Sequence, residues 1–143
     1  MIEQIRRPFR EGIGERPTTT KPTLRQGCEI AAAEIDEATA LLIRARNLIE
    51  GGWCRDGSAR NCLGFRVSPY SKWATRWCMS GAMRVASAGA SDLARRRSHC
   101  RLVAAIGEEF VHVFNDRQRN VKPVLAAFDR AIGEPAALQA GCR

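Results

Sequence analysis

Apolar residues recur every three or four positions through most of this chain, a spacing typical of helices that bury one face. The clearest period covers residues 36–50, where Asp36 is a plausible N-cap. The pair Gly51-Gly52 follows and favours a left-handed end to the helix. Residues 29–35 either extend this helix upstream or form a separate turn. The pattern therefore predicts a first helix over residues 36–50.

A second helix is expected to begin at Ser68-Pro69, because serine is a good N-cap and proline fits the first helical position. This helix would reach about Ala88 and carry a stripe of residues at i, i+4 spacing. Glycine inside a helix costs up to about 1 kcal/mol relative to alanine, so close approach of another element is the expected reason for Gly81. The stripe consists of Trp73, Trp77, Gly81 and Val85.

Two further helices have clear signals at their ends. Ser91 or Asp92 would cap a third helix that Gly107 terminates. Asn120 would cap a last helix over residues 121–132. The residues of these two helices expected to face inward are Leu93, Cys100, Val103, Ile106, Val124, Leu125, Phe128 and Ile132.

The chain of 143 residues is long enough for one domain with a real core. Residues 53–67 contain an Asp-Gly turn pair and a short strand-like run, so we expect a loop or small β-hairpin there. The expected fold is mainly α, a compact bundle of about four helices over residues 28–134 with that hairpin as an insertion. Residues 1–27, which are basic and contain three prolines, should form a flexible extension, and 135–143 a loose tail.

The net charge of the chain is confined to its middle. The sequence carries a formal charge of +8. Residues 51–101 hold ten Lys and Arg against Asp56 and Asp92 alone, while the segments on either side are balanced. A surface that is both cationic and aromatic usually faces an anionic partner. The same stretch contains all the tryptophans of the chain, which are Trp53, Trp73 and Trp77.

The sequence also suggests where the protein works. It lacks a run of 18 or more apolar residues, which a membrane span needs. The first residues lack the continuous apolar core of a secretory signal. We therefore expect a cytoplasmic protein that makes no contact with membrane and keeps its cysteines as thiols.

The standard motifs of catalysis are absent from the sequence. It contains no Walker-type phosphate loop, no HExxH and no GxSxG. A Cys-x2-Cys pair, the usual mark of a structural zinc site, is also missing. Cys54 lies beside Arg55, which could lower its pKa, but no histidine adjoins it in the sequence. We expect no metal, no cofactor and no enzymatic activity. The side chains that a zinc or thiol enzyme would use instead are Cys54, Cys62, Cys78, His99, Cys100 and His112.

The short apolar run Phe110–Phe114 looks strand-like and ends at Asn115-Asp116. This polar pair has two interpretations. It can be a plain turn or helix cap, or it can lie at the mouth of a pocket and bind ribose hydroxyls or amide groups. Arg60-Asn61 in the expected hairpin could face the same pocket.

A resemblance to a known family rests on the order of several short segments. These are Leu48-Ile49-x-x-Gly52-Trp53-Cys54, Ala59-Arg60-Asn61-x-x-Gly64, Val67-Ser68-Pro69, Arg76-Trp77-Cys78-x-x-Gly81-Ala82, Phe114-Asn115-Asp116 and residues 124–132. Over residues 37–133 the chain resembles a family of small bacterial and bacteriophage proteins, domain of unknown function 6197. Phe114 departs from the tryptophan usual there, and residues 117–120 from a commoner Pro-Gly-Arg-Thr-like cap. The resemblance implies a phage or mobile-element setting and supplies no activity.

The leading hypothesis is a non-enzymatic binding protein from a phage or mobile element. It would inhibit a host defence system in the host cytoplasm, as an anti-CRISPR protein does, by binding a nucleic-acid-handling effector or a signalling nucleotide through a basic surface in residues 51–101. The first alternative is a direct nucleic-acid-binding regulator, and the second is a zinc or thiol-dependent enzyme. The sequence leaves the oligomeric state open.

The expected partner is therefore an acidic protein surface, a nucleic-acid-containing complex or a nucleotide. Guanidinium groups suit both phosphates and carboxylates. The residues expected to bind this partner are Arg55, Arg60, Asn61, Arg76, Arg95, Arg96, Arg97, Arg101, Asn115 and Asp116.

Overall fold

The computed structural model describes residues 24–107 and 110–133. Within them the chain forms five helices and a small antiparallel sheet, so the expected mainly α fold with a β-hairpin insertion is confirmed. The expected tail 135–143 lies outside the described residues, as does most of the expected extension. The helices are α1 (Leu24–Gly51), α2 (Met79–Ala86), α3 (Asp92–Ile106), α4 (Val111–Arg117) and α5 (Lys122–Gly133), and the strands are β1 (Ala59–Arg60), β2 (Arg66–Val67) and β3 (Arg76–Trp77).

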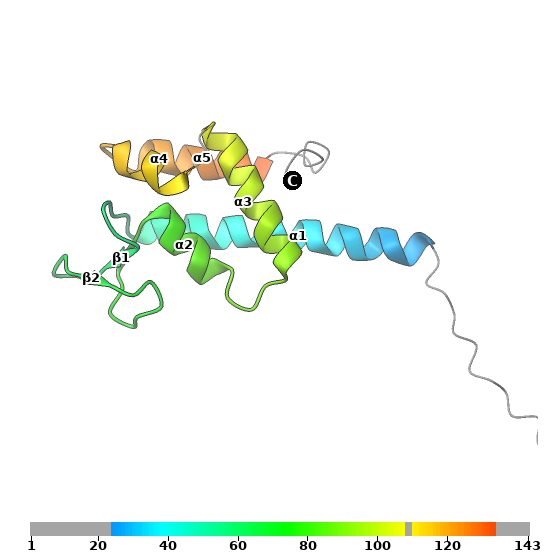
Figure 1. The fold of residues 1–143 in the computed structure, drawn as a ribbon, viewed down its shortest axis with the longest axis horizontal. Coiled ribbons are helices and arrows are strands. Elements are labelled where there is room, and N and C mark those ends of the chain that lie inside the picture. The colour runs from blue at the N-terminus through cyan, green and yellow to red at the C-terminus, as the bar shows by residue number, and fades with distance from the viewer. Residues whose placement is uncertain (1–23, 108–109, 134–143) are drawn as a thin grey trace, which may run out of the picture.

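The long helix α1 is the axis of the domain, and α2, α3 and α5 pack against it (Figure 1). Figure 1 shows α3 crossing α1 and the sheet lying at the end of the domain where α1 stops. The helices share one apolar core, in which the largest side chains are fully buried. These are Leu41, Leu42 and Ile49 of α1, Met79 of α2, Leu102 of α3, and Val124 and Phe128 of α5. No helix in the described part of the chain combines the length and apolar character of a membrane span.

The bounds of α1 differ from the expected helix at its start. It begins at Leu24, so the segment 29–35 extends the helix, and Asp36 lies inside it rather than at its N-cap. The expected end at Gly51 is confirmed, but neither Gly51 nor Gly52 has a positive φ. Gly52 serves another purpose, because a Cβ there would collide with the carbonyl oxygen of Thr75. Gly52 thus lets the loop before β3 lie against the end of α1.

The expected hairpin is present, and a third strand joins it. β1 pairs antiparallel with β2, with Ala59 opposite Val67. On its other edge β1 pairs antiparallel with β3, which places Ala59 opposite Trp77 as well. The sheet order is therefore β2-β1-β3.

The expected helix from Ser68 is wrong in its first half. Residues 68–75 form turns, in which the Ser68 hydroxyl accepts the Tyr70 N–H at 3.3 Å. Pairing with β1 then holds Arg76 and Trp77 in an extended conformation, which a helix cannot provide. The helix starts only at Met79, with Cys78 as N-cap, and the Cys78 Sγ accepts the Gly81 N–H. The role expected for Gly81 is confirmed, since a Cβ there would collide with the Ser58 carbonyl oxygen.

The ends of α3 are confirmed, and its expected apolar face is confirmed in part, since Val103 and Ile106 pack partly buried against the core. The Ser91 hydroxyl accepts the Ala94 N–H at the start, and Gly107 ends the helix in a left-handed conformation with φ 68°. Leu93 is exposed. The fully inward face combines two small and two large side chains and packs against α1 and α5. Its buried residues are Ala94, Ser98, Arg101 and Leu102.

The apolar run that looked strand-like is the short helix α4, which carries Asn115 and Asp116 within it. A run of five residues is too short for its pattern to separate helix from strand, and packing against α2 and α3 decides for the helix. The last helix is as expected. Asn120 Oδ1 accepts the Lys122 N–H at 3.0 Å, and Phe128 is fully buried.

Candidate functional site

Asn115 is fully buried and joins three parts of the fold. Its side-chain oxygen accepts the Trp53 Nε1–H at 2.9 Å and the backbone N–H of Met79 at 3.2 Å. Its amide nitrogen donates to the Cys54 carbonyl oxygen at 3.1 Å and to Asp116 Oδ1 at 2.9 Å. The Met79 N–H is one of those that the start of a helix leaves without a partner. Because every hydrogen-bonding position of Asn115 is used, this residue is structural, and through the Met79 N–H it helps to cap the start of α2.

Two other residues expected to bind a partner shape the hairpin instead. The Asn61 side-chain oxygen accepts the N–H groups of Leu63 and Phe65, at 3.1 Å and 2.9 Å. Arg60 Nη1 donates to the Gly64 carbonyl oxygen at 2.7 Å, across the same turn. These bonds fix the conformation of the hairpin tip.

Arg101 is a correction to the expected binding surface, because it is only 3% exposed. Its guanidinium donates to the carbonyl oxygens of Ala131 and Ile132 at 2.8 Å each, and to Thr39 Oγ1 at 2.9 Å. The two carbonyls belong to the last turn of α5, whose partial negative charge favours a cation. Arg101 therefore joins α3 to the last turn of α5 and to the middle of α1 rather than to a partner.

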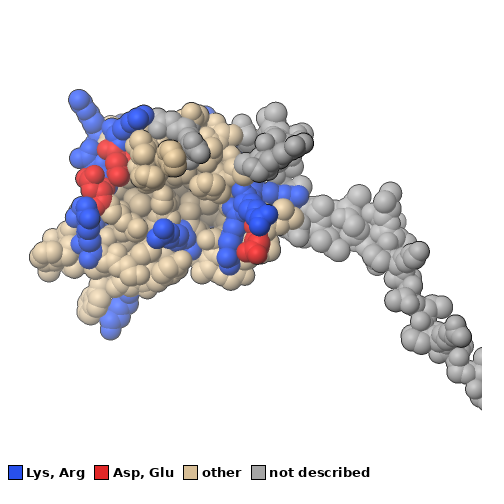
Figure 2. Space-filling model, in the orientation of Figure 1, with Lys and Arg blue, Asp and Glu red and all other residues tan. Residues whose placement is uncertain are grey.

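The remaining expected cations do not form one surface. Arg55 and Arg76 lie near the sheet, whereas Arg95, Arg96 and Arg97 lie on the first half of α3. Arg55 Nη1 also donates to the Gln118 carbonyl oxygen at 3.2 Å. On the face that Figure 2 shows, the Lys and Arg side chains form several separate groups. The folded chain thus divides the cationic stretch of the sequence between two regions.

The first region is at the sheet end of the domain, where large apolar side chains face solvent. Four large side chains are between 63% and 77% exposed, those of Leu63, Phe65, Tyr70 and Trp73. A single exposed apolar residue is ordinary on a protein surface, but a group of them is typical of an interaction site. They lie on the hairpin tip and on the loop from β2 to β3. Exposed cations alternate with them, and Lys72 Nζ lies 5.1 Å from the centroid of the Trp73 ring. We call these residues the apical surface: Leu63, Phe65, Arg66, Tyr70, Lys72, Trp73 and Arg76.

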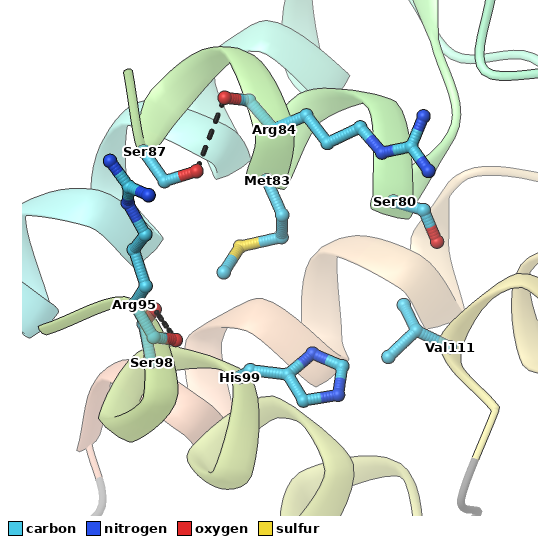
Figure 3. A pocket seen from close by; sticks show the side chains of 8 residues that line it. All are labelled: Ser80, Met83, Arg84, Ser87, Arg95, Ser98, His99 and Val111. Carbon is cyan, nitrogen blue, oxygen red and sulfur yellow. Dashed lines mark hydrogen bonds between the residues drawn. The ribbon is translucent and has the colours of Figure 1, made fainter. Parts of the chain in front are cut away.

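The second region is a hollow of about 250 Å³ between α2, α3 and α4 (Figure 3). We call it the Arg84 cleft, and it is lined by Ser80, Met83, Arg84, Ser87, Arg95, Ser98, His99 and Val111. An adjoining hollow of about 420 Å³ shares Ser80 and Arg84 with it. Of the expected binding residues, the first hollow contains Arg95 and the second contains Asp116.

Most residues of the apical surface and of the Arg84 cleft were not predicted as binding residues from the sequence. Two signals could have found the apical surface. The chain has no carboxylate between Asp56 and Asp92, and the apolar residues of 61–73 follow no helical period. The Arg84 cleft has no such signal, because three separate helices bring its residues together.

The cysteines give little support to a thiol enzyme. Cys54 and Cys78 are buried free thiols, and burial raises the pKa of Cys54 to about 11 and also raises the pKa of Cys78. A protonated thiol is a poor nucleophile. The free thiol of Cys62 is exposed, whereas Cys100 is disulfide-bonded, contrary to the expectation that all cysteines are thiols. Among the described residues, no group of three His, Cys, Asp or Glu side chains could hold a metal ion.

Comparison with known proteins identifies the family. The chain belongs to the family of unknown function DUF6197, whose model matches residues 29–134. This match confirms the resemblance and includes both the apical surface and the Arg84 cleft. No curated protein and no solved structure matches the chain significantly.

Proposed function

We propose that this domain is a non-enzymatic binding module that docks on the acidic surface of a partner protein through the apical surface. The observation that carries the proposal is the exposure of four large apolar side chains within residues 63–73, interleaved with cations. Tyrosine, tryptophan and arginine are the residues that contribute most to protein interfaces. Leaving such side chains in water is unfavourable, and burial against a partner would relieve it.

The charge of the apical surface supports an acidic partner. Arg66, Lys72 and Arg76 lie among the apolar residues, and none of them forms an ion pair within the described part of the chain. These charges are therefore available to carboxylates of a partner, which would increase the association rate and favour one orientation.

The loops that carry the apical surface are held in place by the domain. Asn61 fixes the hairpin tip through the N–H groups of Leu63 and Phe65. The Tyr70 hydroxyl donates to the Arg84 carbonyl oxygen of α2 at 3.3 Å, which ties the second loop to a helix. A surface that is ordered before binding loses less entropy on association.

For the biological setting, our proposal is a phage or mobile-element protein that acts in the host cytoplasm. Its partner would be a nucleic-acid-handling effector of a host defence system, which the domain would inhibit by docking. The small domain, the cationic apical surface and the lack of catalytic motifs support this setting.

The test uses the apical aromatic residues and a matched control. The wild-type protein is used to isolate a partner from host cells, and binding of the purified partner is then measured by calorimetry. Phe65→Ala and Trp73→Ala should each weaken binding by about 30-fold or more, which corresponds to the 2 kcal/mol or more of an interface hot spot. Phe110→Ala removes an exposed aromatic side chain outside the apical surface and should leave binding within about threefold.

The proposal fails if both apical variants, folded as shown by circular dichroism, bind the partner as tightly as the wild type does. It also fails if a partner bound through this surface has no excess of Asp and Glu at the contact. Lys72→Glu separates charge from packing, since it should slow association more than it speeds dissociation.

Direct binding of single-stranded nucleic acid is a second candidate. The observation that favours it is that Phe65, Tyr70 and Trp73 alternate with cations, as in proteins that stack bases on aromatic rings. This function predicts that affinity for a labelled oligonucleotide falls steeply as salt rises. Affinity that is absent, or that does not change with salt, would leave the protein partner as the function.

A further inference from the structure

We propose that the Arg84 cleft and the hollow beside it bind a ribonucleotide, at a site that shares Arg66 alone with the apical surface. Figure 3 shows the cleft between its helices, with Arg84 extending along α2 toward Ser80 and Arg95 lying beside Ser87 on another side. The Met83 side chain points into the space between them. His99 and Val111 lie across the hollow from α2.

The cations of the cleft are free to bind an anion. The Arg84 guanidinium makes no hydrogen bond and no ion pair with any described residue. Arg95 has one ion pair, a 3.5 Å contact with the exposed Asp92 three residues earlier. Such exposed pairs contribute little and exchange readily. No carboxylate lines the cleft. A phosphate is the group that two guanidiniums and nearby hydroxyl groups recognise best.

The cleft also offers apolar contact. Met83 and Val111 line it beside the cations. A free phosphate would leave this surface without a partner, whereas a planar base could pack on it. Methionine adapts its shape to such rings and makes favourable sulfur–aromatic contacts.

The adjoining hollow supplies the groups that a ribose would use. It is lined by the carboxylates of Asp56 and Asp116, together with Arg66 and His112. Asp116 Oδ1 already accepts the Asp56 N–H at 3.1 Å and the Asn115 amide, which holds the carboxylate in place. Its second oxygen is then an acceptor for a hydroxyl group. Each hollow alone is larger than a phosphate, and the volume of the adjoining hollow, about 420 Å³, lies in the range of small-ligand sites.

A ribonucleotide satisfies all three features. Its phosphate would bind the Arg84 guanidinium beside Ser80, its base would pack against Met83 and Val111, and its hydroxyls would lie toward Asp116, while Arg95 adds positive charge from the other side of the cleft. Ser80 and Arg84 line both hollows, so one ligand can extend from one into the other. The signalling nucleotide anticipated from the sequence would thus have a defined site, and this site does not depend on docking through the apical surface.

The experiment measures binding of the four ribonucleoside 5′-monophosphates to the full chain by calorimetry, with inorganic phosphate and the four free nucleosides as comparisons. At least one monophosphate should bind, and at least tenfold more tightly than its nucleoside or inorganic phosphate. Arg84→Gln and Arg95→Gln should each weaken that binding tenfold or more. Arg96→Gln is the matched control, because Arg96 is exposed on the same helix as Arg95 and does not line the cleft.

The inference is wrong if none of the four monophosphates binds the wild-type protein. It is equally wrong if Arg84→Gln binds the nucleotide as the wild type does while its melting temperature is unchanged. Equal affinity for inorganic phosphate and the nucleotide would show an anion site without a base or ribose contact, and would also overturn it. Since Phe65→Ala and Trp73→Ala lie outside the cleft, they should bind the nucleotide normally, so the two proposals can fail separately.

Discussion

Replacing Asn115 by alanine should destabilise the fold more than any other single change to a polar side chain of this domain. The substitution removes an amide that bonds to the loop after α1, to the start of α2 and to Asp116. Alanine leaves the helix α4 intact, because it is the best helix former. The effect therefore reports on the hydrogen bonds and not on the helix that carries them.

The magnitude follows from the groups that lose a partner. The Met79 N–H and the Cys54 carbonyl oxygen belong to residues that are 0% and 6% exposed, so water cannot replace the amide easily. Each buried group left without a partner costs about 1–3 kcal/mol. The Trp53 Nε1–H is part-buried and costs less. We expect a loss of about 3–5 kcal/mol, which is a large share of the roughly 5–15 kcal/mol that stabilises a typical domain.

Urea unfolding followed by circular dichroism measures this loss. Asn47→Ala is the control, because Asn47 is exposed on α1 and its side chain makes no hydrogen bond with the described residues; it should change stability by about 0.5 kcal/mol or less. Asn115→Asp alters a single atom but places a carboxylate oxygen against Asp116 and the Cys54 carbonyl. It should be more stable at about pH 4 than at pH 7, since only a protonated carboxyl can donate a hydrogen bond. A loss below about 1 kcal/mol for Asn115→Ala would refute the reasoning.

Two further predictions test residues that the sequence placed in the binding site or in a thiol enzyme. Arg101→Met should lower the free energy of unfolding in urea by about 2–4 kcal/mol, because the last carbonyls of α5 lose their donor. Arg96→Met, on the exposed side of the same helix, should change it by no more than about 0.5 kcal/mol. Equal effects of the two substitutions would show that Arg101 is not structural. Iodoacetamide at about pH 8 should label Cys62 well before Cys54 or Cys78 in the folded protein, because Cys62 is exposed and burial raises the pKa of the other two. Peptide mapping by mass spectrometry gives the order, and rapid labelling of Cys54 would restore the thiol enzyme as a candidate.

The ends of several helices could be read from the sequence because their signals are local. Ser91 caps α3 and Gly107 ends it, and Asn120 accepts an N–H at the start of α5. A cap needs only one side chain and the next few N–H groups, and a left-handed end needs only a residue that tolerates positive φ. The close approach at Gly81 was also foreseen, since glycine in a helix has a cost that another contact must offset.

The same local signals failed where distant segments competed with them. Ser68-Pro69 has the composition of a helix start, yet β1 takes Arg76 and Trp77 as a third strand. The residues after Phe110 are too few for their periodicity to separate helix from strand, and the helices around them decided. On α3, contacts with α1 and α5 select Arg101 and Leu102 for the buried face and leave Leu93 exposed.

The sequence by itself determined that the protein is a mainly helical domain of one family, with its excess positive charge and its tryptophans in residues 51–101. Only the tertiary structure decided what each of those charges does. Arg101 is turned inward to the end of α5, Arg60 holds a turn, and Arg84 and Arg95 line one cleft from different helices. The physical reason is that charge is a property of a residue, whereas exposure and neighbours are set by contacts between segments far apart in the chain.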